Sequence, residues 1–262
     1  MDLSAKIIAV ANQKGGVGKT TTAINLSAAL AQKRKKILLV DSDPQGNASS
    51  GVGVNMKKVR IHLYHAYSGG YSCAEVLRKS GVTNLDILPS SIDLVAAEIE
   101  MINMTSRETR LKTLLEPLLS SYDYIVIDCP PSLGLLTINA LTSANSVLIP
   151  MQCEYFAMEG LAQLVNTIRS VKKSYNKTLY VEGLVLTMFD KRNRLTHQVA
   201  AEIENHFKDQ LFKTVIPRNV RLSECPSHGQ TIIDYDKQST GAVAYMNLAK
   251  EFLTNQRKYQ DE

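Results

Sequence analysis

Residues 13–22 constrain the fold of this chain more than any other stretch. They read Gln-Lys-Gly-Gly-Val-Gly-Lys-Thr-Thr-Thr, follow the apolar run at residues 6–11, and lead into a helical pattern at residues 21–30. A strand, a glycine-rich loop and a helix in this order predict a phosphate-binding loop, because inward-turned N–H groups and a helix N-terminus both favour anions. A glycine-rich turn that merely has lysines nearby is the alternative interpretation.

The polar residues of this loop suit a nucleotide and a metal ion. Lys19 is placed to reach the β- and γ-phosphate oxygens, and the Thr20 hydroxyl to bind Mg²⁺. Position 13 holds Gln where the usual pattern has a glycine, and a second lysine, Lys14, precedes the paired glycines. We expect the bound nucleotide to contact Lys14, Gly15, Gly16, Val17, Gly18, Lys19, Thr20 and Thr21.

Carboxylates follow two of the predicted strands. Asp41 and Asp43 come after residues 36–40, and Asp128 ends the apolar run at residues 124–128. The carboxyl ends of parallel strands collect ligand chemistry at one edge of a sheet. We expect Asp43 to orient the attacking water, Asp41 to hold the Mg²⁺ hydration shell or the loop itself, and Asp128 to bind Mg²⁺ through a water. An Asx-turn is the alternative for Asp41 and Asp43.

Strand-like apolar runs alternate with helical patterns along almost the whole chain. This rhythm predicts a single doubly wound α/β domain over residues 1–262, with a mostly parallel sheet and helices on both faces. The expected strands are 6–11, 36–40, 85–89, 124–128, 146–150 and 180–188, with another ending at 215–219, and the expected helices include 72–78, 92–104, 107–119, 157–175 and 242–253. Residues 47–83 are the least regular, because glycines interrupt them.

The net charge of +5 is unevenly distributed along the chain. Residues 169–221 contain eleven basic and five acidic side chains, so the rest of the chain is close to neutral. Concentrated positive charge is typical of a surface that binds a polyanion such as nucleic acid. A solvated basic surface without any partner is the alternative.

The remaining composition favours a cytoplasmic protein with no other cofactor. The four cysteines are scattered and form no C-x-x-C pair, which favours free thiols in a reducing compartment. The five histidines form no metal-ligand motif, so we expect no metal beyond nucleotide-bound Mg²⁺. No apolar run is long enough to span a bilayer, and the residues after Leu253 lack the bulky apolar face of a membrane-binding helix.

Several motifs together resemble those of one ATPase family. The loop reads K-G-G-x-G-K-T from Lys14, a deviant Walker A motif, and residues 41–48, 128–134, 186–190 and 216–224 carry further patterns of the family. The chain is therefore similar to the ParA/Soj/MinD family of P-loop ATPases, and most similar to its short chromosomal ParA (Soj) type.

This resemblance implies a weak, magnesium-dependent ATP hydrolase that acts in chromosome or plasmid partitioning. In the family, the lysine matched by Lys14 crosses to the partner's nucleotide, so that an ATP-bound homodimer forms and binds double-stranded DNA of the nucleoid without sequence preference. A ParB-like centromere-binding protein stimulates the hydrolysis. The matched positions are Lys14, Lys19 and Asp43 for catalysis, Met188, Pro217, Arg218 and Asn219 for the adenine, and Arg192 and Arg221 for DNA.

Three other functions stay open at this point. A MinD-like ATPase would position machinery on a membrane, although we expect no membrane association here. An iron–sulfur carrier or reductase has a related fold but uses paired or glycine-flanked cysteines, which this chain lacks. A DNA-binding regulator would use ATP only as a structural ligand.

Overall fold

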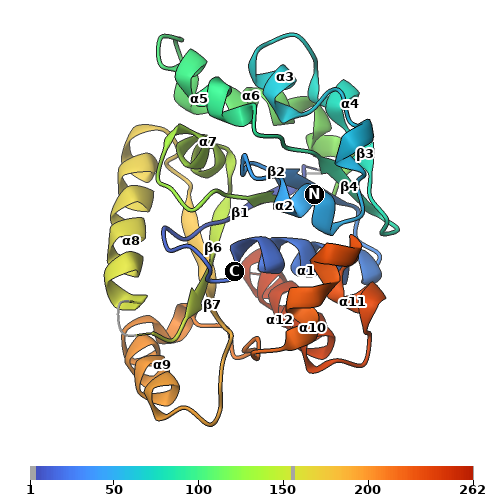
Figure 1. The fold of residues 1–262 in the computed structure, drawn as a ribbon. Helices are drawn as coiled ribbons and strands as arrows, with labels where there is room; N and C mark the ends of the chain where they lie inside the picture. Colours follow the sequence, from blue (N-terminus) through green and yellow to red (C-terminus); the bar gives the residue numbers. More distant parts are fainter. Residues whose placement is uncertain (1–3, 155–156, 262) are drawn as a thin grey trace.

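One mixed sheet organises the molecule. The computed structural model describes residues 4–154 and 157–261, and within them seven strands pair in the order β3-β4-β2-β5-β1-β6-β7 (Figure 1). The strands are β1 (Lys6–Val10), β2 (Ile37–Asp41), β3 (Arg78–Lys79), β4 (Leu85–Leu88), β5 (Tyr124–Asp128), β6 (Ser146–Gln152) and β7 (Tyr180–Thr187). In the described part of the chain only β3 and β4 pair antiparallel, which confirms the predicted, mostly parallel sheet.

The strand order brings the predicted functional motifs to one edge of the sheet. Val10, at the end of β1, lies opposite Asp128 of β5 in the register, and Asp41 of β2 lies opposite Asp128 on its other side. The loop that follows β1 therefore begins beside two strand-end carboxylates. The motifs are far apart in sequence, and the parallel pairing alone makes them neighbours.

One face of the sheet is covered by the first and last long helices. Ile8, Val10, Leu39 and Val126 share a buried apolar cluster with residues of α1 and α12. Figure 1 shows these two helices lying against each other below the sheet. The elements on this side are α1 (Lys19–Gln32), α2 (Asn47–Gly51), α10 (Val220–Glu224), the 3-10 turn η5 (Cys225–His228), α11 (Ile232–Tyr235) and α12 (Thr240–Asp261).

The opposite face carries a second buried cluster. Leu38, Val40, Ile127 and Ile149 belong to it, and they alternate along their strands with the residues of the first cluster, as the period of two requires. Its helices are α3 (Leu63–Tyr67), α4 (Cys73–Val76), α5 (Leu94–Met101), α6 (Arg110–Leu115), α7 (Leu135–Ser143), α8 (Ala157–Ser174) and α9 (Arg194–Phe207). Helices therefore pack on both faces, and the predicted doubly wound fold is confirmed.

Two predicted elements differ from the structure for a reason that involves proline. The helix expected at residues 107–119 is divided into η2 (Arg107–Thr109), α6 and η3 (Glu116–Ser121). The change from α6 to η3 falls at Pro117, which has no N–H to continue the α-helical bonding. The strand expected to end at residues 215–219 is wrong. That segment forms one isolated bridge, between Pro217 and Phe189 just beyond β7, and the Ile216 N–H donates to the Leu186 carbonyl of β7 (2.8 Å). Pro217 lacks the N–H that a continuous ladder needs.

Three helix predictions were wrong in length. The helix expected at residues 72–78 covers only Cys73–Val76, and Arg78 belongs to strand β3. The helix expected at residues 92–104 is shorter, since α5 spans Leu94–Met101. The final helix, expected to end at Leu253, continues to Asp261. Among residues 4–154 and 157–261, no helix combines the length and the apolar character that crossing a membrane requires.

Candidate functional site: a phosphate-binding loop and its carboxylates

The loop between β1 and α1 has the backbone that a phosphate-binding loop needs. Gly16 and Gly18 have φ values of 74° and 82°, a left-handed conformation that glycine adopts without strain. Gly18 is also the N-cap of α1, so the first N–H groups of that helix lie at the end of the loop. The Thr187 hydroxyl donates to the Val17 carbonyl (2.8 Å), which fixes the loop against the end of β7.

Lys19 is a buried cation at the start of α1. Its Nζ donates to the carbonyl oxygen of Lys14 (2.9 Å), and the residue is only 6% exposed. Burial lowers the pKa of Lys19, and the nearby charge of Asp128 opposes that effect most strongly, followed by Cys129 and Asp43. A buried ammonium group inside the glycine loop is well suited to bind phosphate oxygens.

Asp128 is buried with both carboxylate oxygens lacking a hydrogen-bond partner among the described residues. Burial raises the pKa of Asp128 well above its ordinary value, and the charge of Asp41 adds to the rise. The Thr20 hydroxyl lies near enough to oppose it, but this contact lacks the geometry of a hydrogen bond. Unsatisfied carboxylate oxygens beside a hydroxyl are the hard ligands that Mg²⁺ prefers, so Thr20 and Asp128 fit a magnesium ion, held directly or through water.

Asp41 is held by the loop that follows it. The backbone N–H and the hydroxyl of Ser49 donate to its Oδ2 (2.7 and 2.6 Å), and the N–H of Asp43 lies 3.3 Å from its Oδ1. Burial raises the pKa of Asp41 to about 7, although these hydrogen bonds act in the opposite direction. Of the two roles that the sequence left open for Asp41, these contacts favour the holding of the loop.

Asp43 lies at the start of a tight turn. The Gln45 N–H donates to its Oδ1 (2.9 Å), which is the Asx-turn considered as an alternative, and the Ser90 hydroxyl donates to its backbone carbonyl (2.6 Å). Its charge reaches Lys19 and Asp128 and shifts the pKa of each. The turn and the predicted catalytic role are therefore compatible, because the turn fixes where the carboxylate lies.

Lys14 lies at the solvent-exposed rim of the loop. Its N–H donates to the Asn12 side chain (3.0 Å), and Asn12 in turn donates to the Pro150 carbonyl (2.8 Å). Its Nζ forms an ion pair with Glu154 of the same chain, and these side chains are 37% and 43% exposed. The sequence analysis did not single out Glu154, because no spacing rule links residues 140 positions apart.

A pocket of ≈ 280 Å³ lies beside Gly18 and is lined by the residues predicted to contact the adenine. Met188, Pro217, Arg218 and Asn219 all line it. Met188 has a φ of 48°, a strained conformation for a residue with a side chain, and such strain concentrates at functional sites. Other lining residues that the sequence did not reveal include Thr21, Leu222 and Tyr245.

The two arginines predicted to contact DNA are exposed but already paired. The Arg192 side chain is 90% exposed and bonds Asp190 (3.1 Å), and the Arg221 side chain is 54% exposed and bonds Glu224 (3.0 Å). The segments that lead to these two arginines lie side by side, because the Arg218 N–H, before Arg221, donates to the carbonyl of Phe189, before Arg192 (3.3 Å). The structure therefore places both cations on the surface, and Met188 and Arg218, at the starts of their segments, line the candidate adenine pocket.

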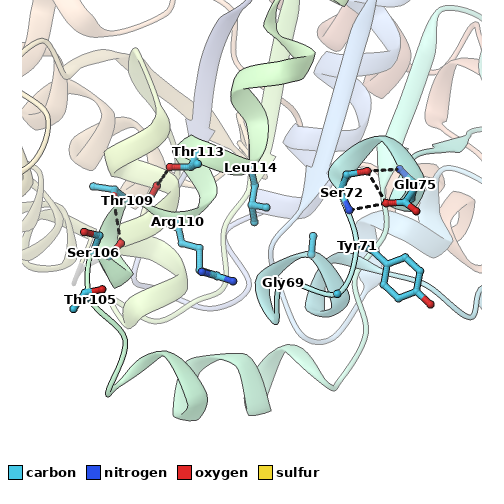
Figure 2. Close-up of a pocket in the computed structure, with 12 residues that line it drawn as sticks. Gly69, Tyr71, Ser72, Glu75, Thr105, Ser106, Thr109, Arg110, Thr113 and Leu114 are labelled. Carbon is cyan, nitrogen blue, oxygen red and sulfur yellow. Dashed lines mark hydrogen bonds between the residues drawn. The ribbon is translucent and has the colours of Figure 1, made fainter.

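Another hollow, of ≈ 390 Å³, lies away from all of these residues (Figure 2). It is formed by the turn around Gly69, the capping box of Ser72 and Glu75 at α4, and the polar side chains near Arg110. The Arg110 guanidinium is already bonded to the Tyr67 carbonyl (2.5 Å). None of the predicted site residues lines this hollow, so it is not part of the nucleotide site.

Comparison with known proteins decides the family. A family model described as "AAA domain" matches residues 5–181. The sporulation initiation inhibitor protein Soj of Bacillus subtilis is 55% identical over 95% of this chain and 99% of its own, and the chromosome partitioning protein ParA of Myxococcus xanthus is 52% identical over 95% and 88%. The chain belongs to the ParA/Soj family. A MinD-like protein is not favoured, because relatives with the Soj and ParA names match nearly the whole chain at this identity.

A solved structure agrees with the fold. A crystal structure described as cobyrinic acid a,c-diamide synthase from Mycobacterium smegmatis, with bound ADP and magnesium, has a TM-score of 0.84 to this chain at 33% identity. It covers 97% of this chain and 96% of its own. The P-loop fold with a bound nucleotide and magnesium ion is thus known in a protein similar to this one over almost its full length.

Proposed function

We propose that the whole chain, residues 1–262, is a magnesium-dependent ATPase that acts as a switch in chromosome or plasmid partitioning. The observation that carries this proposal is the buried carboxylate of Asp128, which lacks a hydrogen-bond partner in the described structure and lies beside Thr20 and Lys19 at the glycine loop. Buried polar groups are nearly always paired, and a carboxylate with both oxygens unsatisfied beside a phosphate-binding loop favours a bound cation at that place. The family of the chain supplies the biological setting.

Each side chain of the site has a distinct task in ATP hydrolysis. Thr20 and Asp128 would hold Mg²⁺, which would supply positive charge to neutralise and orient the phosphates. Lys19 stabilises the charge that develops on the transferred group, and the turn at Asp43 holds a carboxylate in position to orient the attacking water. Met188, Pro217, Arg218 and Asn219 hold the adenine in the pocket beside Gly18.

Lys14 links the bound nucleotide to a second subunit. Its ion pair with Glu154 is substantially exposed on both sides, and exposed ion pairs contribute only about 0–1 kcal/mol. A partner's triphosphate, with several negative charges, competes with a single carboxylate for this lysine. ATP therefore joins two copies of the chain, and the loss of the γ-phosphate weakens the dimer.

The dimer then holds DNA through the basic surface that contains Arg192 and Arg221. Contacts with phosphates carry no sequence information, and two linked subunits multiply the affinity of one. The protein is accordingly cytoplasmic and associated with the nucleoid. Its intrinsic hydrolysis is weak, and a ParB-like centromere-binding protein stimulates it and thereby releases the DNA.

Binding to a random-sequence DNA duplex tests the proposal directly. We expect binding with ATP that falls steeply as salt rises, and little binding with ADP or without nucleotide. Lys14→Ala should retain nucleotide but lose ATP-dependent dimerisation by light scattering and ATP-dependent DNA binding, while the matched control Lys33→Ala should behave as the unmodified protein. DNA binding that is indifferent to nucleotide would contradict the switch.

A further inference from the structure

The hollow of ≈ 390 Å³ beside α6 contains a guanidinium group without an acidic partner (Figure 2). Arg110, the first residue of α6, is partly buried, and its Nε donates to the Tyr67 carbonyl (2.5 Å). Within the described part of the chain, its two terminal nitrogens, Nη1 and Nη2, have neither a hydrogen-bond acceptor nor a carboxylate partner. A cation with unused donors in a hollow is a binding group for an oxyanion, because guanidinium matches carboxylate and phosphate geometry.

This guanidinium is held in position by the chain around it. Its acceptor belongs to Tyr67, which is only 1% exposed and is therefore fixed in the core. The turn at Gly69 passes on the other side, since a Cβ at Gly69 would lie 3.3 Å from Nη2 of Arg110. Figure 2 shows the arginine side chain extending from α6 toward this turn. Donors that are already oriented lose little conformational entropy when a ligand binds.

One wall of the hollow carries two hydroxyl groups that are free to donate. Thr105 and Ser106 line this wall, and neither hydroxyl has a hydrogen-bond partner among residues 4–154 and 157–261. Ser106 also has a φ of 55°, and only four of the described residues other than glycine have a positive φ. Such a left-handed conformation is strained for a residue with a side chain, and strain of this kind concentrates at functional sites.

The opposite wall offers an acceptor. Glu75 lines it, and its Oε2 accepts hydrogen bonds from the N–H (2.9 Å) and the hydroxyl (2.8 Å) of Ser72. The other oxygen, Oε1, has no partner in the described structure, and Glu75 forms no ion pair with Arg110 there. Figure 2 shows Ser72 and Glu75 on the side away from Thr105 and Ser106. A free carboxylate oxygen repels an anion but accepts a hydrogen bond from a hydroxyl group.

We propose that this hollow binds a small polyhydroxylated oxyanion, either a phosphate ester or a carboxylate. Arg110 holds the anionic group, Ser106 donates to it, and Glu75 accepts from a hydroxyl at the other end of the ligand. The volume of ≈ 390 Å³ falls within the range of about 300–1,000 Å³ that is usual for small-molecule sites. No residue of the glycine loop lines the hollow, so this site is separate from the nucleotide site and goes beyond the proposed ATPase function.

The test uses the full chain with Mg²⁺ and ADP present, so that the glycine loop is occupied before a probe is added. The probes are ribose 5-phosphate, gluconate and neutral ribose, and binding is measured by saturation-transfer NMR and by calorimetry. We expect at least one of the two anions to bind, which also tells a phosphate ester from a carboxylate, and ribose to remain unbound. Ribose that binds as well as both anions, or no binding of either anion at millimolar concentrations, would overturn the site.

Two variants decide where the anion binds. Arg110→Gln removes the charge but keeps an N–H donor for the Tyr67 carbonyl, and it should weaken binding of the anion at least about tenfold. Lys112→Gln removes the same charge from an exposed position of α6 outside the hollow and should bind normally. An equal loss in both variants would overturn the site, because binding would then follow net charge. Lys19→Ala should also bind normally, which separates this site from the glycine loop and keeps the test independent of the ATPase proposal.

A third variant examines the strained wall without risking the fold. Ser106→Gly removes the hydroxyl and relieves the left-handed strain, so the melting temperature should not fall while the affinity for the anion falls about threefold. Asn84→Gly relieves the same kind of strain at a φ of 65° outside the hollow and should leave the affinity unchanged. Normal affinity in both Arg110→Gln and Ser106→Gly would overturn the site.

Discussion

The nucleotide edge of the sheet and the basic surface both depend on charge, but they hold it under opposite conditions. At the edge, Asp41, Asp128 and Lys19 are removed from water, and burial shifts the pKa of each away from its ordinary value. On the basic surface, Arg192 and Arg221 are exposed and are paired with carboxylates of their own chain. Removing the first group of charges from water has a large free-energy cost, whereas the second group keeps most of its contact with water.

This difference teaches where single residues should matter. A buried charge interacts through a medium of low effective dielectric and has no water to replace a lost partner, so each substitution has a large effect. An exposed charge is screened by salt and shares its task with neighbouring cations, so each substitution has a modest effect. The following predictions test this contrast, beginning with the largest expected effect.

Lys19→Ala should lower ATP hydrolysis by roughly 10²–10³-fold, because it removes the cation that stabilises charge on the transferred phosphoryl group. The fold should survive, since the lysine's hydrogen bond goes only to a loop carbonyl. Turnover is measured by phosphate release, with Lys33→Ala at the opposite end of α1 as the control. Near-normal turnover would remove the buried edge from the mechanism.

Asp43→Asn should lower hydrolysis by about 10²-fold while nucleotide binding is retained, because the amide keeps the acceptor for the Gln45 N–H but loses the charge that orients water. ATP-bound dimers should then accumulate on DNA. Phosphate release and a DNA retention assay check both statements. Asp209→Asn, at an exposed position, is the control, and equal turnover of the two variants would refute the role of Asp43.

Asp41 should make the nucleotide-free protein less stable as pH rises. Its pKa is about 7 in the folded state and 3.8 as the ordinary value, so the folded protein binds this proton more tightly than the unfolded chain does. The free energy of unfolding should therefore fall between about pH 4 and pH 7, with a slope approaching ~1.4 kcal/mol per pH unit from this group, and then level off.

Asp41→Asn should remove that contribution. Urea unfolding of the variant and of the unmodified protein at several pH values gives the difference between them, which should grow in the variant's favour from pH 4 to pH 7. Asp209→Asn should show no such change. Parallel pH profiles for Asp41→Asn and the unmodified protein would mean that the carboxylate is ionised throughout.

Arg221→Glu should weaken DNA binding by about tenfold at low salt and reduce the salt slope by about 1 for each subunit, because a phosphate contact is lost. Dimerisation with ATP should be unchanged. The measurement is a fluorescence titration across a salt series, with Lys57→Glu as a charge-matched control. Normal DNA affinity would show that the basic surface lies elsewhere.

Glu224→Gln should have the smallest effect and the opposite sign. This carboxylate bonds Arg221 (3.0 Å), so its neutralisation leaves the arginine only the longer ion pair with Asp236 (3.7 Å) and should raise DNA affinity by about two- to threefold at low salt. The same titration measures it. A large increase would contradict the idea that exposed pairs on this surface are weak.

Much of the nucleotide site could be predicted from local sequence. The glycines at 16 and 18, the lysine that follows them and the aspartates at strand ends are short-range patterns, and the structure brings Lys19, Asp41, Asp43 and Asp128 within electrostatic reach of one another. The candidate adenine pocket was predicted only through resemblance. No physical pattern links Met188 with Pro217, and the strand expected before Asn219 is an irregular segment.

The sequence by itself determined the alternation of strands and helices, the glycine loop and the carboxylates at strand ends, because these depend on periodicity and on conformational preferences over a few residues. The tertiary structure alone decided that Lys14 pairs with Glu154, that Thr187 holds the loop at Val17, and that Asp128 is left without a partner in the described structure. The first two contacts join residues 140 and 170 positions apart. Their partners are chosen by how the sheet and its helices pack, which no local pattern encodes.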